Sequence, residues 1–150
     1  MSWVEIIGWS ATAVGALLGF PQLFRLLRTR NVAGLSLLAW QAVLVLNVIW
    51  FTHGVRIGQG PQIVTNSVAL ASTLPLLVLL ARATRRSLFA VVAPSLVAAA
   101  VIIAVDFTLG SLAFGLVATI PGLMSSSGQS VELVRARRVD GVAPVFLALA

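Results

Sequence analysis

The sequence predicts an all-helical integral membrane protein. Of its 150 residues, 59% are hydrophobic and only 9% are charged, and the mean hydropathy is +1.06. Soluble domains average about 25% charged residues, so most of the surface of this chain does not face water. Five apolar runs reach the length of about 20 residues that a helix needs to cross a bilayer. Short arginine-bearing loops separate most of these runs.

Charge and composition exclude several other classes of protein. The net charge is +6, and all ten basic residues are arginines that stand in short clusters between apolar runs. This pattern indicates membrane topology, and no nucleic-acid partner is expected. The absence of cysteine excludes disulfides and thiolate metal sites. The first residues carry no cationic segment, so the first apolar run is predicted to be a retained helix and not a signal peptide.

The first run covers residues 3–24 and contains a proline near its end. Pro21 has no N–H, and its ring clashes with the carbonyl of Leu17, so a weak joint is predicted here. Gln22 is the nearest polar side chain that could satisfy the freed carbonyl. We therefore expect a helix that bends at one membrane face. Small residues on one side of this helix favour close contact with a neighbouring helix; they are Gly8, Gly15 and Gly19.

Four further runs complete the predicted bundle. They cover residues 36–54, 61–81, 87–105 and 110 to the low 130s. The fourth run contains no polar residue between Ser95 and its end, so it is predicted to be a lipid-facing spacer.

Loops that are rich in arginine alternate along the chain with loops that have one arginine or none. Nine of the ten fall on one side of the predicted membrane, and Arg56 alone falls on the other, in the loop between the second and third runs. The loop between the fourth and fifth runs holds Asp106. The positive-inside rule then places the arginine-rich loops in the cytoplasm and the N-terminus outside. We expect a multi-pass protein of a bacterial plasma membrane.

Two segments of the chain resemble each other. With a shift of 107 residues, 21–37 lies over 128–144 with six of seventeen positions identical. The identical pairs are Gln22/Gln129, Leu26/Leu133, Arg28/Arg135, Arg30/Arg137, Val32/Val139 and Gly34/Gly141. One odd helix between the copies indicates parallel repeats. We predict a first three-helix repeat at 1–84, a linker transmembrane helix at 85–106 and an incomplete second repeat at 107–150.

Three motifs carry a resemblance to a known family. Pro21-Gln22 ends the first run, Trp50-Phe51-Thr52-His53-Gly54 ends the second, and Asn66 follows Trp50 by sixteen residues. In this combination the chain resembles the SemiSWEET/SWEET (MtN3/saliva) sugar transporters of the PQ-loop superfamily. The resemblance implies a three-helix PQ-loop bundle that forms half of a transporter.

The resemblance also implies roles for single residues. Trp50 would stack on the sugar ring, Asn66 would bind its hydroxyls, and Pro21 with Gln22 would form the hinge. His53 stands where the family carries a tyrosine, which is a departure from the family pattern at the outer gate. A gate role for His53 with Arg56 is one interpretation of these residues. Gly128 stands where the second repeat would carry the hinge proline. A second repeat or self-association would complete the pathway through the bilayer.

Simpler interpretations of the same residues stay open. Trp50 could be an interfacial anchor, because tryptophan is enriched at membrane surfaces. Asn66 could make an interhelical hydrogen bond to Asn47 or Thr73. His53, the single histidine, could be a solvated helix end. One histidine and scattered carboxylates make no metal site, so no metal or other cofactor is expected.

These residues together favour passive transport of small sugars by alternating access. The first three runs contain no acidic residue except Glu5 at the outer end, and proton relays need an ionisable group within the membrane. The alternatives are a PQ-loop amino-acid transporter and a non-transporting receptor or scaffold on the same fold. An enzyme is not expected, because the chain shows no acid–base pair and the Ser125–Ser127 run has no nearby histidine or aspartate to make a nucleophile.

Overall fold

The computed structural model describes residues 3–17, 19–135 and 142, and every regular element in these residues is an α-helix. The helices are α1 (Trp3–Leu17), α2 (Gly19–Thr29), α3 (Leu37–Ile57), α4 (Gly60–Ala83) and α5 (Leu88–Arg135). Three of them, α3, α4 and α5, are long and apolar enough to cross a membrane. The all-helical class and the assignment to a membrane are therefore confirmed at this level.

The second and third predicted spans correspond to α3 and α4 within a few residues. Ser36 begins α3, because its hydroxyl oxygen accepts a hydrogen bond from the backbone N–H of Ala39 at 3.2 Å. Gly58 ends α3 in the left-handed conformation that glycine tolerates best. Pro61 falls in the first turn of α4, where a missing N–H costs nothing.

The first predicted span corresponds to α1 and α2, which lie on either side of Leu18, a residue outside the described part of the chain. Leu17 is the last residue of α1, and it is also the residue whose carbonyl Pro21 was predicted to displace. Pro21 is the third described residue of α2. Gln22 is fully buried. The weak joint at Pro21 and its function as a hinge stay predictions.

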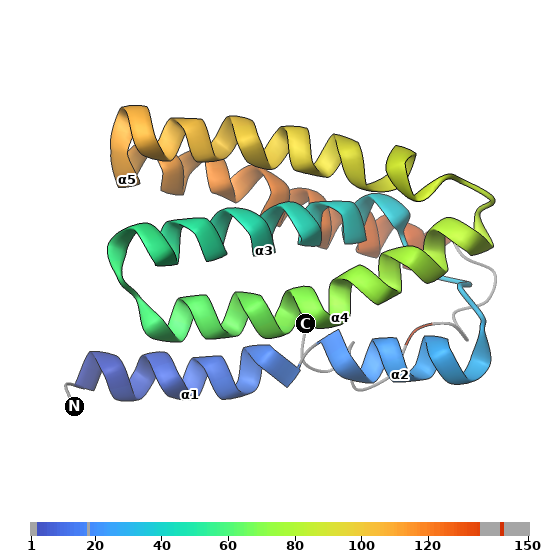
Figure 1. The fold of residues 1–150 in the computed structure, drawn as a ribbon. Coiled ribbons are helices and arrows are strands. Elements are labelled where there is room, and N and C mark those ends of the chain that lie inside the picture. The colour runs from blue at the N-terminus through green and yellow to red at the C-terminus, as the bar shows by residue number, and fades with distance from the viewer. Residues whose placement is uncertain (1–2, 18, 136–141, 143–150) are drawn as a thin grey trace.

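The fourth and fifth predicted spans are the two legs of α5. Gly110 interrupts the helix with φ 82° and ψ 177°, a conformation open almost exclusively to glycine. The chain reverses there, so residues 88–109 and 111–135 run antiparallel (Figure 1). Helix α3 packs between α4 and the two legs, and α4 lies against α1 and α2 (Figure 1).

Small residues bring the first two helices close to α4. A Cβ on Gly8 would lie 3.3 Å from the side chain of Pro61, and a Cβ on Gly19 would meet the side chain of Ser72. The predicted small-residue contact is confirmed for these two glycines. The surroundings of Gly15 lie outside the described residues.

The first leg of α5 is not a lipid-facing spacer over its whole surface. Val91, Ala99 and Ile102 are buried, whereas Val97 and Val101 on the opposite side are 65% and 61% exposed. The prediction was right for one face and wrong for the other. A purely aliphatic run gives no contrast between its faces, so the buried side is decided by what packs against it.

The two ends of the bundle differ in charge. The α3–α4 turn and the reversal of α5 share one end, and the α4–α5 turn and the loop before α3 share the other (Figure 1). The described arginines at the second end are Arg25, Arg28, Arg30, Arg82, Arg85, Arg86 and Arg135, and Arg56 lies at the first. The charge asymmetry that was read from the sequence is therefore present in three dimensions.

Paired positions of the predicted repeat meet in one core. Leu26 is buried and Leu133 packs against the same cluster, and Leu35 and Val142 are both buried in it. Residues 136–141 and 143–150 of the second copy lie outside the described residues. The division at 84 and 106 into a repeat, a linker and an incomplete repeat stays a prediction.

We predict that Gly110→Ala destabilises the protein by about 1–3 kcal/mol, because no alanine adopts this backbone conformation without strain. Thermal unfolding in detergent, followed by tryptophan fluorescence, measures the effect. Gly115→Ala is the matched control, since a Cβ there meets nothing within 4 Å. Equal midpoints for the two variants would contradict a reversal of the chain at Gly110.

Candidate functional site

An open cleft of about 900 Å3 lies between α1, the end of α3 and the beginning of α4. Its lining residues come from these helices and the α3–α4 turn; they are Gly8, Trp9, Ala11, Thr12, Trp50, Gly58, Gln59, Gly60, Pro61, Gln62, Thr65 and Asn66. The two residues predicted to bind substrate, Trp50 and Asn66, therefore line the same cleft from different helices.

The ring of Trp50 packs against two other rings. Its ring lies edge-on to Phe114 at 5.0 Å and to His53 at 5.7 Å between centroids. The side-chain amide of Gln62 donates a hydrogen bond to the backbone carbonyl of Trp50 at 3.0 Å. Trp50 is half-buried among these groups, a setting that differs from a tryptophan anchored at the lipid surface.

Asn66 does not make the interhelical bond that was considered for it. Its Nδ2 donates to the carbonyl of Gln62 on its own helix at 2.8 Å. Asn47 and Thr73, the two partners proposed for Asn66, instead bond to each other. Asn47 Nδ2 donates to Thr73 Oγ1 at 3.0 Å in the buried core. Among the described residues, the Oδ1 atom of Asn66 makes no hydrogen bond and stays available to a ligand.

The rest of the cleft is polar but uncharged. The hydroxyl of Thr65 lies 2.9 Å from that of Thr12, and both also contact the carbonyl of Pro61. None of the described lining residues carries a charge. Such a surface offers hydroxyl, amide and aromatic groups to a neutral, hydrogen-bonding ligand.

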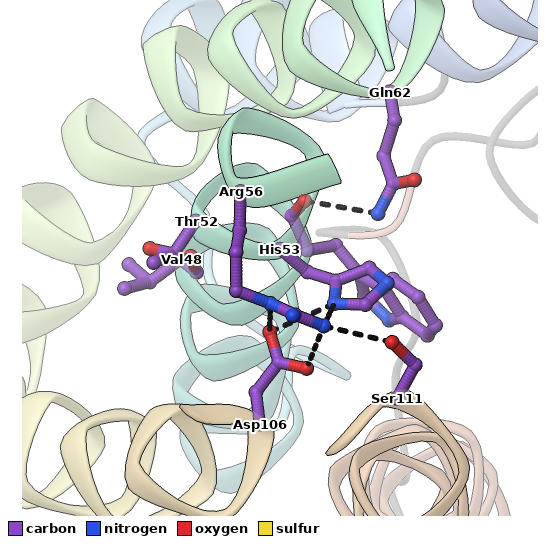
Figure 2. A network of polar contacts seen from close by, with 8 residues as sticks. Val48, Thr52, His53, Arg56, Gln62, Asp106 and Ser111 are labelled. Carbon is purple, nitrogen blue, oxygen red and sulfur yellow. Dashed lines mark hydrogen bonds and ion pairs between the residues drawn. The ribbon is translucent and has the colours of Figure 1, made fainter. Parts of the chain in front are cut away.

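A buried ion-pair network lies next to the cleft (Figure 2). Arg56 Nε is 2.8 Å from one carboxylate oxygen of Asp106, and Arg56 Nη2 is 2.6 Å from the other. The same carboxylate accepts a hydrogen bond from Nδ1 of His53 at 2.8 Å. Arg56 Nη2 also donates to the hydroxyl of Ser111 at 2.7 Å. The arrangement is a bidentate pair, which is stronger than a single contact between the same charges.

The network ties the last turn of α3 to the reversal of α5. Asp106 is only 2% exposed, and His53 is 6% exposed and stacks on Phe114 at 4.4 Å between centroids. The interpretation of His53 as a solvated helix end is therefore wrong. The sequence could not show this, because Asp106 arrives from a different helix, 53 residues later in the chain.

Asp106 is the member of this site that sequence reasoning missed. A signal was present, since the alternation of loops places the loops of Arg56 and Asp106 at the same membrane face. An arginine and a carboxylate at one face can pair when both are partly withdrawn from water, and Glu5 and Asp106 were the two carboxylates predicted at the face of Arg56.

The two residues that were predicted to form the hinge lie outside the cleft. Pro21 and Gln22 belong to α2 and do not line it.

Within the described residues, no group of three metal-ligating side chains is present.

Comparisons with known proteins add no assignment: no family model, curated protein or solved structure matches the chain. The resemblance to the SemiSWEET/SWEET family thus rests on the motif residues.

We predict that Asp106→Asn lowers the stability by about 3 kcal/mol, the smaller end of the range for breaking a buried ion pair, because the guanidinium is partly exposed. Adding Arg56→Met to this variant should recover part of the loss, since no unpaired charge is left. Thermal unfolding in detergent measures both variants. Glu132→Gln is the control and should change the stability by less than about 0.5 kcal/mol. Additive effects of the two substitutions would show that the pair contributes nothing.

Proposed function

We propose that the protein is a membrane carrier subunit that binds a small sugar in the cleft and passes it across the bilayer by alternating access. The observation that carries the proposal is the placement of Trp50 and Asn66 on two helices around one cleft. Both residues come from the motifs that resemble the SemiSWEET/SWEET family.

The chemistry of the cleft suits a sugar. An indole ring covers the apolar C–H face of a pyranose, and an amide supplies two donors and an acceptor for its hydroxyls. The hydroxyls of Thr12 and Thr65 add further polar contacts at the same wall. A zwitterionic amino acid would leave two charges facing a lining in which no described residue is charged. The lining therefore favours a neutral solute.

The moving parts in this proposal are the hinge and the gate. The hinge is the division between α1 and α2 with Pro21 and Gln22. The gate is assigned to His53 and Arg56, which form an ion-pair network with Asp106 at the end of the bundle that holds the α3–α4 turn; none of the three lines the cleft. The arginine-rich end would face the cytoplasm and the gate would face outside.

Passive transport is part of the proposal. Asp106 places a carboxylate inside the bundle, but the guanidinium of Arg56 already compensates its charge. A carboxylate held by a permanent cation is a poor proton carrier. We therefore propose uniport, completed by a second repeat or by a second copy of this chain.

We predict that Asn66→Ala lowers sugar uptake into proteoliposomes about tenfold, since each hydrogen bond to a ligand hydroxyl contributes about 0.5–1.5 kcal/mol and the amide makes two or more. Trp50→Ala should lower it further through loss of the stacking surface. Ser67→Ala is the matched control, because Ser67 is the next residue of α4, is exposed and does not line the cleft. Equal loss in the Asn66 and Ser67 variants would contradict the assignment of the cleft.

We also predict that labelled sugar equilibrates across the vesicle membrane but does not accumulate when a pH gradient is imposed, because no described residue provides an unpaired buried acid. Accumulation above equilibrium would contradict uniport. Uptake of labelled arginine in place of sugar would favour the amino-acid transporter. No flux of either solute, with partner binding unchanged by Asn66→Ala, would favour a receptor or scaffold.

A further inference from the structure

A second concave surface lies at the arginine-rich end of the bundle, remote from the cleft. Helices α4 and α5 diverge from the turn that joins them (Figure 1). Between them is a groove of about 500 Å3. Its walls are entirely aliphatic and aromatic; the lining residues are Leu74, Val78, Leu88, Phe89, Val92, Ala93 and Leu96. Phe89 is 81% exposed at its rim. In a membrane such a groove is filled by a hydrocarbon chain.

A cationic turn lies directly beside the groove. Arg85 and Arg86 stand between the last turn of α4 and Leu88, the first lining residue from α5. Arg82 follows Val78 by one helical turn on α4. The three arginines are exposed, and among the described residues their side chains make no hydrogen bond or ion pair. Hydrocarbon walls that continue into uncompensated positive charge match the chain and the headgroup of one amphiphile.

The backbone of the turn shows that an arginine is kept at a position better suited to glycine. The N–H of Arg86 donates to the carbonyl of Ala81 at 2.9 Å, and the N–H of Arg85 donates to that of Arg82 at 3.2 Å. This pair of bonds is the motif in which a left-handed residue, usually glycine, ends a helix. Arg85 occupies the left-handed position with φ 55°.

From the groove, the charge and the turn together, we propose that this surface binds an anionic phospholipid of the adjoining leaflet. One acyl chain lies between α4 and the first leg of α5, and the phosphate contacts Arg85 and Arg86. This proposal is independent of sugar transport, because none of these residues lines the cleft. Binding would stabilise the junction of α4 and α5, where the groove separates the two helices.

The test is native mass spectrometry of the full chain, with phosphatidylglycerol and phosphatidylcholine of identical acyl chains added separately. The wild-type protein should retain phosphatidylglycerol in preference to phosphatidylcholine. Arg85→Gly should lower phosphatidylglycerol retention about fivefold, the value of one arginine near a membrane surface. The same substitution should raise the unfolding midpoint of the lipid-free protein, because glycine relieves the left-handed strain. Loss of binding would then not come from loss of fold.

Arg30→Gly is the matched control. Arg30 lies in the other arginine-rich loop, also has a positive φ, 54°, and lines a separate cavity. It should gain stability in the same way and keep its phosphatidylglycerol. A second pair of variants tests the groove itself. Ala93→Trp fills it and should lower retention of phosphatidylglycerol, whereas Ala104→Trp, on an exposed face of the same leg, should not.

Three results would overturn the proposal. Equal retention of the two lipids would show that the arginines recognise no headgroup. An equal loss in the Arg30 and Arg85 variants would show diffuse attraction between the loops and the membrane. Unchanged retention in the Ala93→Trp variant would show that the acyl chain does not enter the groove.

Discussion

The ion pair between Arg56 and Asp106 is the contact on which the arrangement of α3 and α5 depends. In lipid, apolar helices gain little by meeting each other, since the bilayer is as apolar as their side chains. Polar contacts and close packing therefore decide which helices associate. The bidentate pair joins the last turn of α3 to the reversal of α5, and Ser111 extends the tie into the second leg. Through His53 and Phe114 the same contact supports the ring of Trp50, and with it one wall of the cleft.

Further hydrogen bonds hold the helices together at a distance from the Arg56–Asp106 pair. The amide of Gln129 donates to the carbonyl of Gly34 at 2.7 Å, and its oxygen lies 3.4 Å from the N–H of Ser36. The amide of Gln41 donates to the carbonyl of Val91 at 2.7 Å. Both legs of α5 are thus hydrogen-bonded to α3 or to the loop before it. The cleft faces the other side of α3, toward α1, where small residues permit close approach and the described polar groups are hydroxyls and amides.

The helices and their order were predictable because local chemistry decides them. Apolar length predicted α3 and α4 closely, and the loop arginines predicted which turns share an end. The same reasoning predicted that Trp50 and Asn66 act at one site, and both residues line one cleft. It failed at His53 and at the first leg of α5, where the result depends on a partner that is distant in sequence. It also assigned the wrong hydrogen-bond partners in the core, where Asn47 and Thr73 bond to each other and Asn66 bonds to neither.

By itself, the sequence determined the helical class, the residence in a membrane and the end of the bundle that carries positive charge. Each of these follows from the hydropathy, length and spacing of neighbouring residues. The tertiary structure alone decided that Asp106 reaches Arg56 and His53, which face of a uniformly aliphatic leg is buried, and that two helices diverge to leave a groove beside Arg85. The physical reason is that an ion pair and a packing surface need two partners in space. One-dimensional patterning specifies which residues seek a partner, but not which partner the fold brings within 3 Å.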